Sequence, residues 1–291
     1  MDVGVARRIG LVGLVAASAA VFASGLVLYA DAADSRAPGD DLRPDLIVQR
    51  PTELYLAEGG SEIRLRVSNT IANQGSGPLE MTGNGSPCPY PGKTLGRLTV
   101  QQLYRDSDDP GSPGFFVRAQ DSSFDALDAG CSRYHPKHEH WHFDNFARYT
   151  LLDERTGDAV GGSRKVSFCV VDTGRPYPSL SGSPTEGYYP QDPEATDPKL
   201  RSCSETSVDG LSVGWEDTYG ASLPGQGIKV GGLPRGAYCL VLDVDPADTG
   251  LPGGVLAESN ELNNTRTIRL RMRPGKLQVR RLGSVCQALQ I

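Results

Sequence analysis

Apolar and polar residues alternate along much of the chain beyond residue 45, in the pattern of half-buried β-strands. Ile63, Leu65 and Val67 alternate with polar residues, which places the apolar side chains on one face of an extended segment. Similar short runs predict further strands at residues 46–48, 98–104, 146–152, 165–171, 228–230, 238–244 and 267–272. No long stretch has the 3.6-residue period of an amphipathic helix. The sequence therefore predicts a mainly β fold with a sandwich-like, antiparallel core.

Glycine and proline separate these predicted strands. The chain has 35 glycines and 21 prolines, which predict long loops between the strands. Residues 75–78 are expected to form a turn, with 79–81 pairing beyond it, and 106–114 form an acidic loop whose spacing does not match an EF-hand. Residues 174–200 show no periodicity and are interpreted as a long loop. Nothing in the pattern requires a further boundary, so residues 45–291 are interpreted as one domain.

The first 32 residues have the features of an export segment. Arg7 and Arg8 precede an apolar run from Ile9 to Ala30, and a small-x-small cleavage pattern ends at residue 32. The apolar run is also long enough to span a bilayer as an uncleaved anchor. We therefore expect residues 1–32 to be a signal peptide or an N-terminal membrane anchor, and 33–44 to be a flexible lead-in. Either way, the body of the protein is expected to be secreted or held outside the cytoplasm.

Charge and cysteine content narrow the function classes. The formal net charge is −6, which argues against a nucleic-acid binder and is compatible with cationic partners such as amines. The six cysteines are even in number and none stands in a CxxC pair, which fits an oxidising compartment. Three disulfides are expected, in any of fifteen arrangements. Buried free thiols are the alternative.

All four histidines of the chain lie within eight residues, at His135, His138, His140 and His142. Neutral imidazole is the commonest metal ligand among side chains, so this cluster predicts a metal site. In a flat strand the Cα atoms of His138 and His142 would lie about 13 Å apart. Two imidazoles barely reach one ion across that span, so we expect a curved or irregular segment, which Pro136 favours. A pH-sensitive patch or unrelated surface histidines are the alternatives.

The residue types also limit the identity of the metal. Nitrogen ligands with open positions suit Cu(II), and Zn(II) is an alternative, although the affinity order favours copper at such a site. An iron site with two histidines and the carboxylate of Asp144 is a further alternative. The residues by themselves therefore predict a histidine-rich copper or zinc site outside the cytoplasm.

The motifs around the histidines resemble those of the lysyl oxidases. That family has H-x-x-H-x-H-x-H and then a strand ending in Y-x-L-L-D, and this chain has H-P-K-H-E-H-W-H at 135–142 and Y-T-L-L-D at 149–153. The family has a lysine before S-F-C, as at 165–169, and a G-L-S-x-G segment that runs into D-T-Y-G, as at 210–220. The family's later E-S-D/N-x-x-N-N stretch is matched by E-S-N-E-L-N-N at 258–264. The chain resembles a bacterial-type member of this family.

The matches keep the family's order over roughly residues 130–272, and they imply roles for single residues. The copper ligands are matched by His138, His140 and His142. The two residues that are cross-linked into the organic cofactor lysine tyrosylquinone are matched by Lys165 and Tyr219.

The resemblance further implies the oxidative deamination of a primary amine, with peptidyl lysine as one candidate substrate. O2 is the oxidant, and the products are an aldehyde, hydrogen peroxide and ammonia. A general base must remove a proton from the substrate. His135 and Asp217 are the candidates for this base, and His135 is equally suited to orienting a metal ligand.

The resemblance also bears on the disulfides. Cys169 follows the S-F pair as in the family, where its partner lies shortly downstream, which implies Cys169–Cys203. The other two pairs are then taken to be Cys88–Cys131 and Cys239–Cys286. Lys137 and Trp215 stand where the family has further cysteines, so the disulfide framework is expected to differ from that of the animal enzymes.

Two other functions compete with a copper amine oxidase. One is an extracellular metal-binding or adhesion β domain without chemistry, in which Lys165 keeps a free amine and Tyr219 a plain phenol. The other is a zinc hydrolase built on the histidine cluster, although the chain has no HExxH motif.

Overall fold

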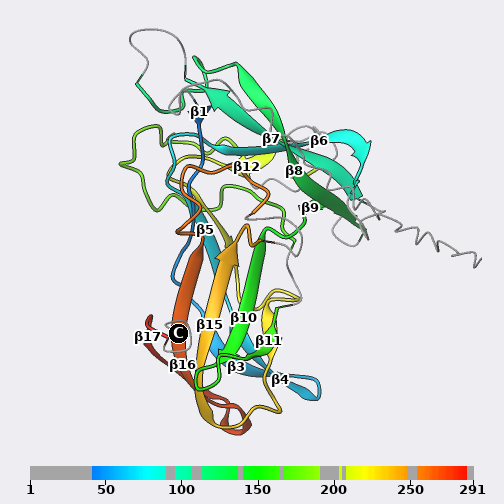
Figure 1. The fold of residues 1–291 in the computed structure, drawn as a ribbon, viewed down its shortest axis with the longest axis vertical. Coiled ribbons are helices and arrows are strands. Elements are labelled where there is room, and N and C mark those ends of the chain that lie inside the picture. Colours follow the sequence, from blue (N-terminus) through cyan, green and yellow to red (C-terminus); the bar gives the residue numbers. More distant parts are fainter. Residues whose placement is uncertain are drawn as a thin grey trace, which may run out of the picture. The chain divides into compact units, whose positions relative to one another are not determined.

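A computed structural model of the chain describes residues 41–89, 96–106, 113–136, 140–163, 167–190, 203–204, 208–247 and 254–286 (Figure 1). These residues form β-strands and one short 3₁₀ turn, η1 (Pro274–Lys276), with no α-helix among them. The predicted mainly β fold is confirmed. In the described part of the chain no helix has the length and apolar character needed to cross a membrane. The expected export segment, residues 1–32, lies outside that part.

The first sheet carries the residues around the histidines. Its strand order is β12-β6-β7-β8-β9, and β1 pairs with β7. The strands are β1 (Asp41–Leu42), β6 (Leu79–Pro87), β7 (Gly96–Arg105), β8 (Phe124–His135), β9 (His140–Phe143) and β12 (Asp209–Leu211). Because β1 belongs to this sheet and Leu42 is buried, the ordered structure begins before residue 45, within the expected lead-in.

The remaining strands form the sandwich-like part. A five-stranded sheet has the order β11-β10-β15-β16-β17, and two three-stranded sheets have the orders β13-β5-β2 and β14-β4-β3. The five-stranded sheet consists of β10 (Ala147–Asp153), β11 (Ala159–Gly162), β15 (Gly236–Val244), β16 (Thr265–Arg273) and β17 (Gln278–Gly283). The smaller sheets consist of β2 (Leu46–Val48), β3 (Leu54–Gly59), β4 (Glu62–Val67), β5 (Asn69–Asn73), β13 (Glu216–Tyr219) and β14 (Gly227–Lys229). All of these pairings are antiparallel.

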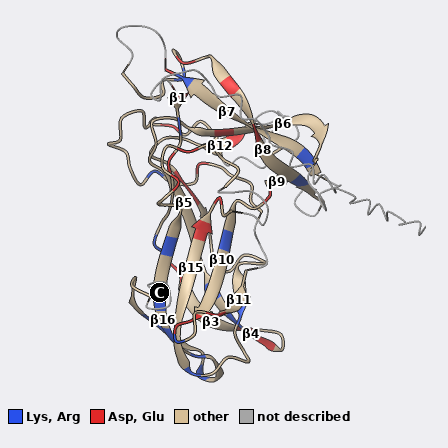
Figure 2. Ribbon diagram, in the orientation of Figure 1, with Lys and Arg blue, Asp and Glu red and all other residues tan. Residues whose placement is uncertain are grey.

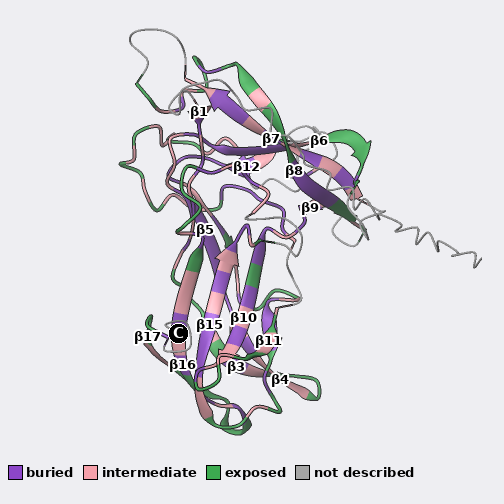
Figure 3. Ribbon diagram, viewed as in Figure 1, coloured by how far each residue is buried: buried purple, intermediate pink, exposed green. Residues whose placement is uncertain are grey.

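The main core lies between the five-stranded sheet and the two smaller sheets. In β10, Ala147 and Tyr149 are buried whereas Arg148 between them is exposed (Figure 3). Leu240 of β15 and Leu65 of β4 join the same apolar cluster from opposite layers. The period-two pattern that predicted these strands therefore corresponds to one buried face on each of them.

Truncating Leu240 tests how much this core contributes to stability. Leu240 is fully buried in the middle of β15, so Leu240→Ala should lower the free energy of unfolding by about 2–5 kcal/mol. Leu262→Ala is the matched control, because Leu262 is 96% exposed and its truncation should change stability by no more than about 0.5 kcal/mol. Urea unfolding of both variants measures the difference, and equal stabilities would contradict this account of the core.

Residues 79–81 pair beyond the turn at 75–78, as expected, with β12 and β7 as their neighbours. Two segments differ from the pattern-based expectation. Residues 167–171 do not form a ladder strand, because Phe168 makes only an isolated bridge with Phe143 and its burial comes from side-chain packing. The long strand β8 was missed, because its first half is exposed on both faces and shows no alternation. Residues 174–190 contain no named strand, as expected for a loop, and 191–200 lie outside the described residues.

Candidate metal centre

The β8–β9 hairpin gathers three of the four histidines. His135 ends β8, and in the antiparallel register it pairs with His140 of β9. His140 and His142 are two residues apart on β9, so their side chains point to the same face of the strand. A directly opposed residue shares that face as well. The hairpin therefore places His135, His140 and His142 together on one face.

The imidazole rings converge at short distances. The Nε2 atoms of His140 and His142 lie 2.8 Å apart, and the ring centroid of His142 lies 4.8 Å from that of His140 and 5.2 Å from that of His135. His142 is buried, with 5% of its surface exposed. Two ring nitrogens this close can share a proton or bind one cation. The donor set fits a borderline transition metal such as copper or zinc. His138, the remaining predicted ligand, lies outside the described residues.

The other edge of β9 is held by a segment far away in the sequence. The backbone N–H of Trp141 donates to the backbone carbonyl oxygen of Cys203 (2.7 Å). The guanidinium of Arg97 lies 4.2 Å from the Trp141 ring centroid. Phe143 and Phe168 exchange two backbone hydrogen bonds, at 2.7 and 3.0 Å. The strand that carries two histidines is therefore fixed on both sides, by β8 and by the chain around Phe168 and Cys203.

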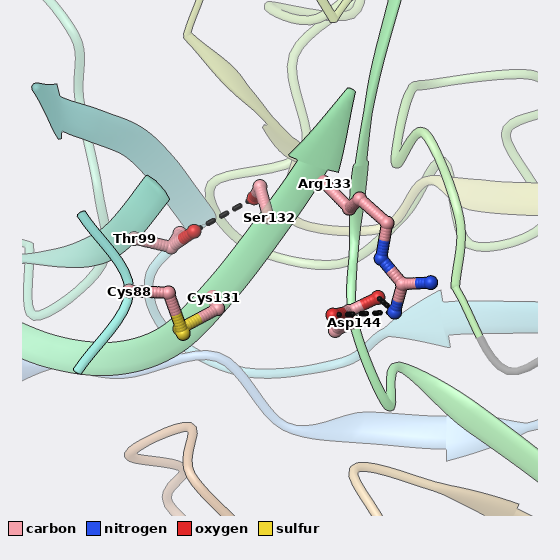
Figure 4. The surroundings of a disulfide bond; sticks show 6 residues. All are labelled: Cys88, Thr99, Cys131, Ser132, Arg133 and Asp144. Carbon is pink, nitrogen blue, oxygen red and sulfur yellow. Dashed lines mark hydrogen bonds and ion pairs between the residues drawn. A yellow bond between two sulfur atoms is a disulfide. The ribbon is translucent and has the colours of Figure 1, made fainter. Parts of the chain in front are cut away.

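Asp144 follows β9 and has a charged partner. Both of its carboxylate oxygens accept hydrogen bonds from Nη2 of Arg133, at 3.1 Å each, and Asp144 itself is buried (Figure 4). On the same stretch of β8, Ser132 is hydrogen bonded to Thr99 and Cys131 forms its disulfide. Arg133 is therefore the charged partner of the buried Asp144 carboxylate.

Tyr219 lies at the end of β13, against the segment that pairs with β9. Its hydroxyl donates to the carbonyl oxygen of Cys169, and its ring meets the Phe168 ring edge-on, with the centroids 4.6 Å apart. Burial raises the pKa of the Tyr219 phenol well above its usual value, and the charge of Asp217 adds to the shift. Tyr219 is therefore a protonated phenol at neutral pH in this structure. Phe168 packs against Tyr219 and is hydrogen bonded through its backbone to Phe143, the residue after His142.

Asp217 lies beside Tyr219 on the buried side of β13. The two residues are two positions apart, so their side chains share a face, and Asp217 is 3% exposed. The charge of Asp217 also raises the pKa of the nearby Tyr149 phenol, although burial is the larger cause. The Tyr149 hydroxyl donates to Gln226 at 2.8 Å. The sequence did not predict that Tyr149 and Gln226 would belong to this polar group. Tyr149 lies in a predicted core strand and Gln226 in a predicted loop.

The six cysteines form three disulfides: Cys88–Cys131, Cys169–Cys203 and Cys239–Cys286. These are the pairs expected in the sequence analysis. Cys169–Cys203 has the closest relation to the site, since the Cys169 carbonyl accepts from Tyr219 and the Cys203 carbonyl accepts from Trp141. This disulfide therefore joins the two segments that contact Tyr219 and the histidine strand. Lys165, four residues before Cys169, lies outside the described residues.

Removing Cys169–Cys203 should therefore affect the site as well as stability. For a loop of 34 residues, loss of the cross-link lowers the free energy of unfolding by about 4 kcal/mol on a chain-entropy estimate. The double variant Cys169→Ala/Cys203→Ala should also bind copper more weakly while folded. Cys239→Ala/Cys286→Ala is the control: its loop of 47 residues gives a similar loss of stability, but copper affinity should be retained. Equal copper affinities of the two double variants would contradict the assigned role.

A second group of acidic side chains consists of Asp245 and two glutamates of the segment 258–264, which matched the family pattern. Ligand oxygens of Asp245, Glu258 and Glu261 lie within 4.8 Å of one another. Glu258 accepts hydrogen bonds from the Leu46 N–H at 2.6 Å and from the Asn264 side chain at 2.8 Å. Burial raises the pKa of Glu258 to about 9. The two hydrogen bonds accepted by Glu258 connect the turn before β16 to β2. The polar side chains of this segment therefore have a structural role.

Comparison with known proteins gives a limited but specific relationship. No model of a known protein family matches the chain. The chain is 33% identical to protein-lysine 6-oxidase of Homo sapiens over 115 residues, which are 39% of this chain and 23% of that protein. It is 32% identical to protein-lysine 6-oxidase of Sus scrofa over 115 residues, 39% of each. Lysyl oxidase homolog 1 of Homo sapiens is 32% identical over 114 residues, 39% of this chain and 17% of that protein.

The similarity covers well under two thirds of the length of each of these relatives. It is therefore a similarity between one segment of this chain and one segment of each relative. The comparisons therefore support a relationship of this chain to the lysyl oxidase family.

Proposed function

We propose that this protein is a secreted, copper-dependent amine oxidase that converts primary amines to aldehydes. The observation that carries the proposal is the physical connection between the histidines and Tyr219. His142 continues into Phe143, Phe143 pairs with Phe168, and Phe168 packs on Tyr219. Phe168 thus lies between the histidine strand and the phenol ring of Tyr219.

The histidines would hold the copper ion. His140 and His142 supply two converging ring nitrogens, and His138, two residues before His140, supplies the third in the proposal. A nitrogen donor set favours copper over zinc at equal supply. His135 packs against His142 at 5.2 Å between ring centroids, which suits it to orienting that ligand.

Lys165 and Tyr219 would supply the organic cofactor. Lys165 precedes Phe168 by three residues in the sequence, and Phe168 packs on Tyr219. The cross-linked quinone supplies an electrophilic carbonyl for a primary amine, and copper with O2 supplies the oxidation. The Phe168 ring packs on the Tyr219 ring and on that of Phe146, with centroid distances of 4.6 and 5.9 Å.

Asp217 is the better of the two candidate bases. It lies on the same face of β13 as Tyr219, is buried, and its charge acts on the Tyr219 phenol. His135 faces the other histidines instead. In the proposal Asp217 accepts the proton from the carbon next to the amine nitrogen.

The natural substrate is proposed to be a primary amine such as a lysine side chain. Two of the relatives are named protein-lysine 6-oxidases, and the net charge of −6 favours the approach of cations. Secretion agrees with three disulfides, which persist in oxidising compartments. The N-terminal segment would then export or anchor the protein.

A direct assay tests the proposal. The copper-loaded, aerated protein is mixed with simple alkylamines and with lysine-containing peptides, and O2 consumption and hydrogen peroxide are followed. One amine, one O2 and one water should give one aldehyde, one ammonia and one hydrogen peroxide. A zinc-loaded sample should be inactive. Absence of peroxide with every amine, in protein shown to contain copper, would favour the metal-binding domain instead.

A further inference from the structure

The charge of this chain is unevenly distributed. The net charge is −6, yet residues 265–281 contain six arginines, one lysine and no acidic residue. These residues form β16, η1 and β17, at one edge of the five-stranded sheet. Figure 2 shows basic residues along β16. The amine oxidase proposal gives this basic hairpin no role.

A pocket of about 330 Å³ opens at this edge. Its walls are formed by Arg50, Arg266, Thr267, Ile268, Arg281, Gly283 and Ser284. Arg50 comes from the segment after β2, whereas the others come from β16 and the end of β17, so the pocket lies at the seam between the two layers of the sandwich. Leu270 and Arg281 are paired in the register of β16 and β17, which places Arg281 on the core-facing side.

Two of the three guanidinium groups in the pocket, those of Arg266 and Arg281, are held by neutral acceptors. Arg266 donates from Nε to the carbonyl oxygen of Val48, and Arg281 donates from Nη2 to that of Pro51, both at 2.5 Å. Among the described residues, neither they nor Arg50 form an ion pair with an acidic side chain. Arg269, on the opposite face of β16, does pair with Glu154. Backbone carbonyls therefore orient the positive charges of the pocket without neutralising them.

Two further features of Arg281 are consistent with an unneutralised positive charge in this pocket, namely its lowered pKa and a bulge in β17 beside it. Burial lowers the pKa of Arg281, and the nearby charge of Arg50 lowers it further. The register of β17 shifts between Arg281 and Gly283, which leaves one extra residue in the strand opposite Leu270 and Arg269. Such a bulge re-aims neighbouring side chains. Arg50, Arg266 and Arg281 line one pocket, where a bound anion would relieve the repulsion between their positive charges.

We propose that this pocket binds an oxyanion, with Arg50 and Arg281 as its main ligands and Arg266 as a third positive charge. Planar guanidinium groups recognise phosphate, sulfate and carboxylate through paired N–H donors. The volume of the pocket suits one such group rather than an extended polymer. A free anion and an anionic lipid headgroup share this chemistry.

Calorimetry with inorganic phosphate tests the proposal. The disulfide-bonded, full-length protein is used without copper, so that phosphate cannot bind at the histidines, and ionic strength is kept constant with chloride. We expect saturable binding of one phosphate per chain. Arg50→Gln should weaken the affinity at least about tenfold, because it removes one charged set of donors.

Arg280→Gln is the matched control. Arg280 is exposed, pairs with Arg271 and lies next to Arg281 on the opposite face of β17, so the substitution removes the same charge from the same strand. Its affinity for phosphate should stay within about twofold of the original. No saturable binding, or an equal loss in both variants, would overturn the proposal.

Vesicles distinguish the two sources of the anion. The original protein and both variants are mixed with phosphatidylcholine vesicles with and without phosphatidylglycerol. Retention on the anionic vesicles that is lost only in Arg50→Gln identifies a lipid headgroup. Phosphate binding without such a difference on vesicles identifies a free anion, and both results support an oxyanion pocket.

Discussion

His142→Ala should weaken copper binding at least about 100-fold and abolish amine oxidation. His142 is the most buried histidine of the described cluster, its Nε2 lies 2.8 Å from that of His140, and its strand leads directly to Phe143. Loss of a group that merely supports a metal ligand costs about 10–100-fold in affinity, so loss of a ligand should cost more. Competition titration with a copper chelator measures the affinity.

His135→Ala is the comparison that separates a ligand from an orienting residue. His135 contacts His142 but belongs to β8, so its loss should weaken copper binding by no more than about 100-fold and leave measurable activity in copper excess. If His142→Ala bound copper like the original protein, or if His135→Ala lost more affinity than His142→Ala, the assignment of ligands would be wrong.

Tyr219→Phe should give a folded, copper-binding protein without any quinone or amine oxidase activity. The substitution removes the hydrogen bond from the Tyr219 hydroxyl to the Cys169 carbonyl, which should lower the free energy of unfolding by about 1 kcal/mol. The ring itself, and its packing on Phe168, are retained. Circular dichroism, bound copper and visible absorbance separate these effects.

Tyr149→Phe is the matched control for this experiment. Tyr149 is also a buried tyrosine, and it donates a hydrogen bond to Gln226 at 2.8 Å, so the substitution removes a comparable hydroxyl close to Asp217. It should leave the quinone absorbance in place. Amine oxidation by Tyr219→Phe at the original rate would refute the cofactor assignment, whatever the behaviour of Tyr149→Phe.

The sequence predicted the fold where one face of a strand is buried and the other is not. The buried and less buried residues alternate over 64–67 and 240–244, and both segments form strands. β8 could not be predicted, because half of it is exposed on both faces. The segment 167–171 looked like a strand because its side chains are apolar, but Phe168 is buried by neighbouring rings rather than by a sheet.

The site was predictable in its residue types and not in its arrangement. Spacing alone grouped His140 with His142, but it could not show that β8 returns to place His135 opposite His140. The position of Phe168 between the histidine strand and Tyr219 depends on contacts between segments that are distant in the sequence. Local patterns carry no information on such contacts, whereas the matched motifs indicated which distant residues to examine.

The most direct test of the amine oxidase account is peptide mass spectrometry of the copper-loaded, aerated protein. The account predicts that the peptides containing Lys165 and Tyr219 are joined covalently. The mass of the product should equal their sum plus one oxygen atom minus four hydrogen atoms, and the intact protein should show quinone absorbance. Two separate, unmodified peptides from protein with bound copper would contradict the account and leave a metal-binding β domain.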